Sequence, residues 1–235
     1  SSLTRHELKE QLEHDQFTDN IELALDYVNT HRQQVIRWSA IVAAVLIVAG
    51  AGYWYFQHAK SLRQQALGAA LDVVESQVGG QADPYALNFP TQQAKDEAIM
   101  KAFAKVAGEY GGTKEGYVAQ YYLGSVQADN GKYAEAEKNF KEVADAGTEY
   151  SALAKVALSQ LYAGQGKLSD AQNLLQGLIN NPIALVSKQQ AQLMLAVLVS
   201  GKNELQAKEI AKYLRKTADR PAVQRGADLV LKDLK

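Results

Sequence analysis

The sequence predicts an all-helical protein in which one hydrophobic helix near the N-terminus precedes a stack of helical hairpins. Three observations support this fold class. A long uncharged run starts at Trp38, and glycines recur 35 positions apart at Gly131, Gly166 and Gly201. The chain also has only 4 Pro in 235 residues, and it is rich in Ala, Leu, Gln, Glu and Lys, which favour helix.

The charge balance and the missing cysteines exclude several classes of function. Lys and Arg number 25 against 26 Asp and Glu, so the net charge is −1 and nothing in it favours nucleic acid as a partner. With no Cys, the chain forms no disulfide, thiolate metal site or thiol nucleophile. No nucleophile elbow, phosphate-binding loop or zinc-protease motif occurs, so we expect a protein that is not an enzyme, with no cofactor, metal or small-molecule substrate.

The uncharged run reads WSAIVAAVLIVAGAGYWYF from Trp38 to Phe56. About 20 apolar helical residues cross the hydrocarbon core of a bilayer, and aromatic residues stand at both ends, as they do at membrane interfaces. We therefore assign residues 38–57 to a single transmembrane helix in preference to a buried core helix or a cleaved signal peptide. Ala40, Ala44 and Gly52 lie at multiples of four, a spacing that allows another helix to approach closely. An equally weighted alternative is that small residues are simply common in such helices.

Residues 1–37 form an acidic tail, in which two short amphipathic helices are expected, starting near Thr4 and Asp19. Four Lys or Arg residues occur in the tail, against two in the equal length that follows the transmembrane segment (58–94). The positive-inside rule then places the N-terminus in the cytoplasm and the larger C-terminal part across the membrane.

The region after the membrane segment contains a repeat of helix–turn–helix units. GYVAQYYLGSVQADNGKYAEAEKNFKEV begins at Gly116, and LAKVALSQLYAGQGKLSDAQNLLQGLINNP begins at Leu153 with matching residues at matching offsets. A period near 34 residues is typical of tetratricopeptide (TPR) repeats, in which small residues mark the crossing of two helices and large apolar residues fill the space to the next hairpin. The residues of this signature are Leu123, Gly124, Gly131, Tyr133, Ala136, Phe140, Leu158, Gly166, Ala171, Leu175, Pro182 and Gly201.

Flanking segments extend this repeat into a domain that covers residues 58–235. A third unit is expected from 191–199 and 205–214, and an earlier unit from 62–77 and 98–110, joined by a long loop over 79–92. Pro221 starts a last helix, which reaches about Leu234 and caps the stack. The prediction is a TPR-like α-solenoid of three to four hairpins with a C-terminal capping helix.

The inner helices of the repeats are the expected partner-binding surface. The candidate residues are Tyr121, Ser125, Gln160, Leu195 and Leu198. The Lys and Asn residues with which some TPR domains grip a C-terminal carboxylate are missing from these positions, so that clamp is not predicted. A mixed apolar and polar inner face is suited to a helix or an extended peptide in a groove, although several of these residues could simply pack the solenoid.

An acidic tail, one membrane anchor and a degenerate TPR domain resemble the YfgM family of membrane-anchored TPR proteins. The resemblance is carried by the order of the segments and by the repeat sequences from Gly116 and Gly166. It implies a scaffold subunit in the bacterial inner membrane, with a periplasmic domain that links the Sec translocon to periplasmic chaperones or client proteins. The alternative is an accessory structural subunit of another bacterial membrane complex, respiratory or photosynthetic, held by the transmembrane helix and the tail.

Overall fold

The computed structural model describes residues 32–80 and 87–234, and it divides the chain into two compact units, residues 1–60 and 61–235. The predicted helices of the acidic tail lie outside the described residues. Within the described residues, helices α2 to α10 and one pair of very short strands make up the regular structure. The all-helical prediction is therefore confirmed.

The first unit consists, as far as it is described, of the N-terminal part of helix α2 (Arg32–Glu75). Its large apolar side chains are mostly exposed, with Trp38, Ile47 and Phe56 at 68%, 70% and 73%. An 18-residue window of α2 has a mean hydropathy of 2.0 and none of its residues is buried. By length and composition, α2 is able to cross a membrane.

Helix α2 ends in the second unit, where its last residues lead into a pair of two-residue strands. Strand β1 (Gln77–Val78) pairs in parallel with β2 (Asn88–Phe89). The sequence predicts a helix up to residue 77 and then a loop over 79–92, because two residues are too few to show the alternation of a strand. Helix α3 (Gln92–Glu109) then begins six residues before the predicted start, where the Thr91 hydroxyl accepts a hydrogen bond from the backbone N–H of Ala94.

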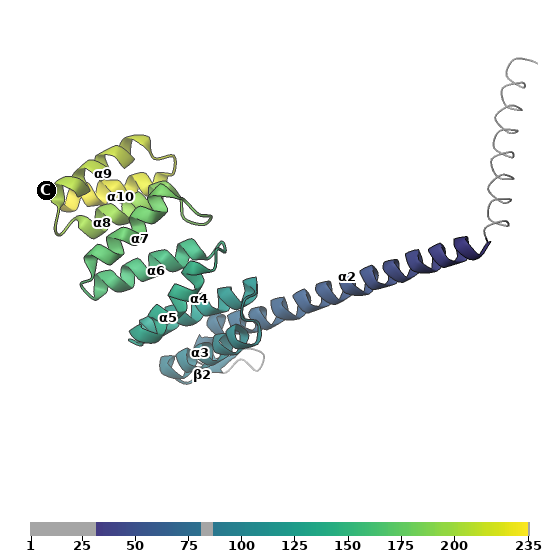
Figure 1. Cartoon of the computed structure of the whole chain (residues 1–235). Coiled ribbons are helices and arrows are strands. Elements are labelled where there is room, and N and C mark those ends of the chain that lie inside the picture. The colour runs from purple at the N-terminus through teal and green to yellow at the C-terminus, as the bar shows by residue number, and fades with distance from the viewer. Residues whose placement is uncertain (1–31, 81–86, 235) are drawn as a thin grey trace, which may run out of the picture. The chain divides into compact units, whose positions relative to one another are not determined.

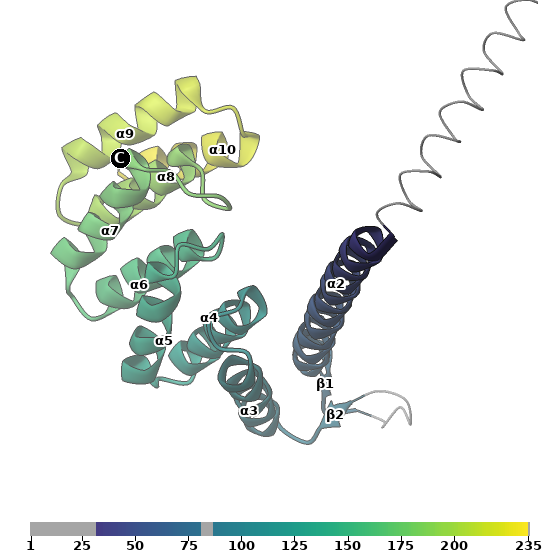
Figure 2. The same ribbon diagram turned by 45° about the vertical axis from the view of Figure 1, so that its right-hand side comes forward.

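Helices α3 to α10 of the second unit form a stack in which consecutive helices pack against each other (Figures 1 and 2). Three hairpins follow α3, and α10 packs against both α8 and α9 as the predicted cap. These helices are α4 (Lys114–Asp129), α5 (Tyr133–Asp145), α6 (Ser151–Gly164), α7 (Leu168–Asn180), α8 (Lys188–Val199), α9 (Glu204–Thr217) and α10 (Pro221–Asp233).

The first two hairpin turns have the same geometry, 35 residues apart. Gly131 and Gly166 have φ of 73° and 75°, a left-handed conformation that glycine adopts without a steric penalty. In each turn the following lysine N–H bonds to a carbonyl five residues earlier, at 2.8 Å, as in a Schellman motif. The turn at Gly201 is different, because Gly201 is not in the left-handed region and Asn203 caps the next helix with its side chain.

The small residues of the repeat lie where two helices cross closely. A Cβ built on Gly124 would be 2.9 Å from Cε1 of Phe140, and Phe140 itself is only 2% exposed. Ala136 and Ala171 are fully buried and Leu175 is 2% exposed. Tyr133 departs from the expectation that it fills the gap to the next hairpin. It is the first residue of α5 and is 52% exposed.

Candidate functional site

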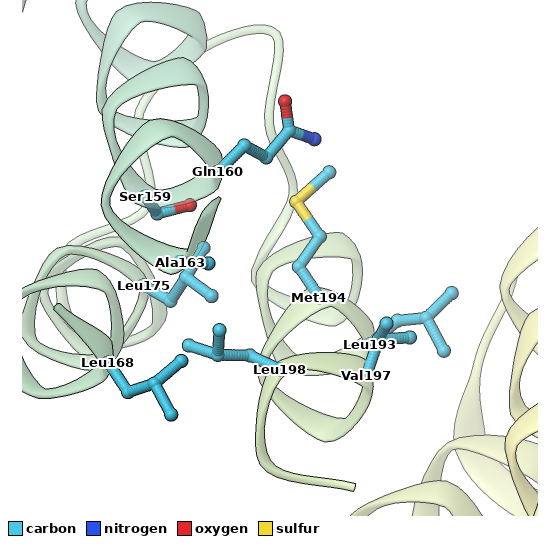
Figure 3. Close-up of a pocket in the computed structure, with 9 residues that line it drawn as sticks. All are labelled: Ser159, Gln160, Ala163, Leu168, Leu175, Leu193, Met194, Val197 and Leu198. Atoms are coloured by element: carbon cyan, nitrogen blue, oxygen red, sulfur yellow. The ribbon is translucent and has the colours of Figure 1, made fainter. Parts of the chain in front are cut away.

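A hollow of about 540 Å³ lies between α6, α7 and α8, and we call it the α6–α8 groove (Figure 3). Its lining is dominated by aliphatic side chains, with two uncharged polar residues on α6. The lining residues are Ser159, Gln160, Ala163, Leu168, Leu175, Leu193, Met194, Val197 and Leu198.

Helical spacing explains why these residues meet. Met194 and Leu198 are four residues apart on α8, and Gln160 and Ala163 are three apart on α6, so each pair shares one face of its helix. Figure 3 shows Met194 and Gln160 near each other at one end of the groove, and Leu198 reaching toward Leu168 at the other. The small Ala163 side chain leaves the space between the helices open.

The exposure of the lining residues changes from the floor of the groove to its mouth. Leu175 forms part of the core and is 2% exposed, whereas Val197 is 56% exposed. The Ser159 hydroxyl is buried and donates to the Val156 carbonyl at 2.7 Å, within its own helix. The groove therefore presents aliphatic surface to solvent, with the exposed Gln160 amide at its edge.

The charged residues of this region gather on the other side of α6 and α7, around Tyr162. Lys155 and Asp170 line a separate hollow there together with Tyr162. The Lys167 Nζ lies 5.3 Å from the centroid of the Tyr162 ring, a cation–π arrangement. Burial, and then the hydrogen bond that its hydroxyl donates to Glu137 at 3.0 Å, raise the pKa of Tyr162.

Two of the five predicted partner-binding residues, Gln160 and Leu198, line the groove. Leu195 does not, because its side chain is 3% exposed and packs in the core. The adjacent Met194 lines the groove instead, and a role for Leu195 in partner binding stays a prediction.

Tyr121 and Ser125 lie on α4, away from the groove. Tyr121 sits in an aromatic cluster, with its ring centroid 5.6 Å from that of Tyr150 and 5.9 Å from that of Phe140. Burial in this cluster raises the pKa of the Tyr121 phenol. The Ser125 hydroxyl donates to the Tyr121 carbonyl at 3.1 Å, so both residues already have partners within the fold.

Sequence reasoning missed seven lining residues, of which Leu175 was named only as part of the repeat signature. The other six are Ser159, Ala163, Leu168, Leu193, Met194 and Val197. The aliphatic run LMLAVLV on α8 is itself visible in the sequence, but it is apolar on every side. A helix of this kind does not show which of its faces is covered, so periodicity could not separate Met194 from the buried Leu195.

The predicted helix-packing residues of the membrane segment lie in α2. Ala40, Ala44 and Gly52 are exposed in the structure, and their contact with another helix stays a prediction. Pro182 follows the end of α7 and is also exposed. Among residues 32–80 and 87–234, no group of three His, Asp or Glu side chains has the geometry to hold a metal ion.

The stack of hairpins and the aliphatic groove define a helical-repeat solenoid of the kind that binds other proteins. Residues 31–184 match the model of the tetratricopeptide repeat-like domain family, and the chain belongs to that family. This fold is that of a protein–protein interaction scaffold and is typically not an enzyme.

Comparison with solved structures found similar helical-repeat proteins. A tetratricopeptide repeat protein from Parabacteroides merdae is 15% identical with a TM-score of 0.51, over 73% of this chain and 59% of that one. The nearly identical TPR-like repeats of a protein from Podosopora anserina are also 15% identical, with a TM-score of 0.46 over 61% of this chain and 87% of theirs. No match was found among curated proteins.

Proposed function

We propose that this chain is a membrane-anchored scaffold subunit that holds partner proteins against one face of a bacterial inner membrane. Segment 38–57 is the anchor, residues 1–37 are the cytoplasmic tail, and 58–235 form the periplasmic TPR-like domain. The partners are a membrane complex such as the Sec translocon, together with periplasmic chaperones or client proteins. The observation that carries the proposal is the α6–α8 groove, an open aliphatic surface on a repeat domain that follows an apolar helix.

Two features support the membrane part of the proposal. The apolar side chains of α2 are exposed over more than five turns, and in water this surface would be costly to hydrate. Trp38 at one end and Tyr53 and Trp54 at the other lie where aromatic side chains meet lipid headgroups.

Purification of the tagged full chain in mild detergent tests the identity of the partners. We expect translocon subunits and periplasmic chaperones to co-purify, and a chain that lacks residues 98–235 to lose them. Recovery of a respiratory or photosynthetic complex that survives this deletion would contradict the proposal and favour contacts through the anchor and tail.

The absence of cysteine makes the orientation directly measurable, because a single introduced thiol is the only one in the chain. Ser169 is exposed on α7, and Ser2 lies in the tail. In spheroplasts, a membrane-impermeant maleimide should label the Ser169→Cys protein and label Ser2→Cys only after lysis. The reverse pattern would overturn the assigned orientation.

A further inference from the structure

We infer that the α6–α8 groove binds one face of an α-helix from a partner protein, and that this face is aliphatic and carries no charge. The inference rests on the proposed function and names the chemistry of the partner at that site. It follows from the distribution of charge around the groove and from the hydrogen-bonding needs of a bound segment.

Charged residues are nearly missing from the segment that supplies Leu175 and the four lining residues of α8. Between Ala171 and Gly201 the one charged residue is Lys188, at the first position of α8 and outside the lining. Charged residues make up 22% of the whole chain, so this stretch of 31 residues differs sharply from the rest. Depletion of charge is what distinguishes the buried core of a protein interface from ordinary surface.

The other charged side chains of these helices do not line the groove. Lys155, Lys167 and Asp170 are placed around Tyr162, on the far side of α6 and α7. A charge on the docked face of a partner would therefore lose its water without gaining an opposite charge. Because an unpaired buried charge costs several kcal/mol, the groove selects against charged faces.

The lining also favours a helix over an extended peptide. An extended chain would press its backbone N–H and C=O groups against aliphatic side chains, and the exposed Gln160 is the main polar group of the lining with which it could bond. Backbone groups buried without partners are unfavourable, whereas a helix bonds its own backbone internally. Met194 adds a flexible side chain that adapts to the ridges of a helix.

Introducing a charge of either sign at Met194 tests the inference. The probes are fluorescent amphipathic peptides of about 16 residues, long enough to form a helix in a bound complex. They differ at one central position of the apolar face, which is Leu, Lys or Glu. The protein is the full chain in phosphatidylcholine nanodiscs, and binding is measured by fluorescence anisotropy with empty discs subtracted.

We expect the Leu peptide to bind the natural chain at least about tenfold more tightly than the Lys and Glu peptides do. Met194→Glu should weaken the Leu peptide and strengthen the Lys peptide, and Met194→Lys should do the same for the Glu peptide. Met194→Gln is the neutral control of similar volume. Leu205→Glu is the control for position, because Leu205 is 70% exposed on α9 and does not line the groove.

A reversal of preference cannot come from unfolding, so a destabilised variant does not imitate the expected result. Equal binding of all three peptides to the natural chain, or equal effects of Met194→Glu and Leu205→Glu, would overturn the inference. If translocon subunits still co-purify with a Met194→Glu chain, the proposed function stands and the groove is not its contact. If the peptides reverse as expected but no membrane complex co-purifies, the proposed function fails and the groove chemistry stands.

Discussion

Substitution of Gly124 by alanine tests how closely α4 and α5 cross. The added Cβ would be 2.9 Å from Cε1 and 3.0 Å from Cδ1 of Phe140, and Phe140 is almost fully buried and has little room to move. Overpacking of a core costs about 1–3 kcal/mol, while replacing a helical glycine with alanine gains about 1 kcal/mol. We therefore expect a net loss of about 1 kcal/mol in the free energy of unfolding.

Gly177→Ala is the matched control. Gly177 lies in the last turn of α7, is exposed, and has nothing within 4 Å of an added Cβ. Here the gain in helix propensity acts alone, so this variant should be more stable by up to about 1 kcal/mol. The two substitutions are chemically identical and differ only in what the new methyl group meets.

Thermal unfolding followed by circular dichroism separates the two variants. For a domain of this size, a change of 1 kcal/mol shifts the Tm by about 2–4 °C, downward for Gly124→Ala and upward for Gly177→Ala. Trimming Phe140 to leucine should offset part of the Gly124→Ala loss, giving a coupling of about 0.5–3 kcal/mol in a double-mutant cycle. A Gly124→Ala protein that is as stable as Gly177→Ala would refute the close crossing.

Three further predictions concern single contacts of the second unit. Gly116→Ala would bring a Cβ to 2.1 Å from the backbone oxygen of Tyr110, and a backbone atom cannot move aside as a side chain can. We therefore expect the free energy of unfolding, measured with denaturant, to fall by about 3 kcal/mol or more. A variant as stable as the natural chain would contradict this geometry. Arg63→Met removes the guanidinium that donates to Glu115 at 3.2 Å and leaves a carboxylate that is 10% exposed without its partner, so the free energy of unfolding should fall by about 3 kcal/mol. Adding Glu115→Gln should recover much of this loss in the same denaturant unfolding measurement. No recovery would show that packing by Arg63 matters more than its charge. Burial raises the pKa of Tyr121 in the folded state, so the stability that the protonated phenol contributes is complete below the unfolded-state pKa of about 10 and is lost as the pH rises through the folded-state pKa. In unfolding curves recorded at alkaline pH, Tyr121→Phe should therefore lose less stability above pH ~10 than the natural chain does. Superimposable curves would argue against the effect.

The local elements of the fold could be predicted because their causes lie within a few residues. The turns at Gly131 and Gly166 need a residue that tolerates positive φ, and the sequence supplies glycine at both places. Pro221 begins α10, and its missing N–H is not needed at the first position of a helix. The start of α3 was misplaced, although Thr91 is a capping residue that could have located it.

The candidate site was only partly predictable, because it depends on which faces of the helices meet. Gln160 and Leu198 were identified from the repeat register, and both line the groove. Tyr121 was assigned to the same surface, but its ring lies among other aromatic rings. The neighbouring sequence does not distinguish an aromatic side chain that binds a partner protein from one that packs within the fold.

The sequence by itself determined the features that follow from composition and short-range spacing. These are the helical class, the apolar run long enough to cross a membrane, and the 35-residue repeat with its glycine turns. Each depends on backbone preference or on the hydrophobicity of consecutive residues, which need no knowledge of distant contacts. The tertiary structure decided which apolar residues of α6, α7 and α8 are buried and which line the groove, because burial depends on which faces of these neighbouring helices pack against each other. Leu195 and Met194 are adjacent and both apolar, yet one lies in the core and the other faces solvent in the groove.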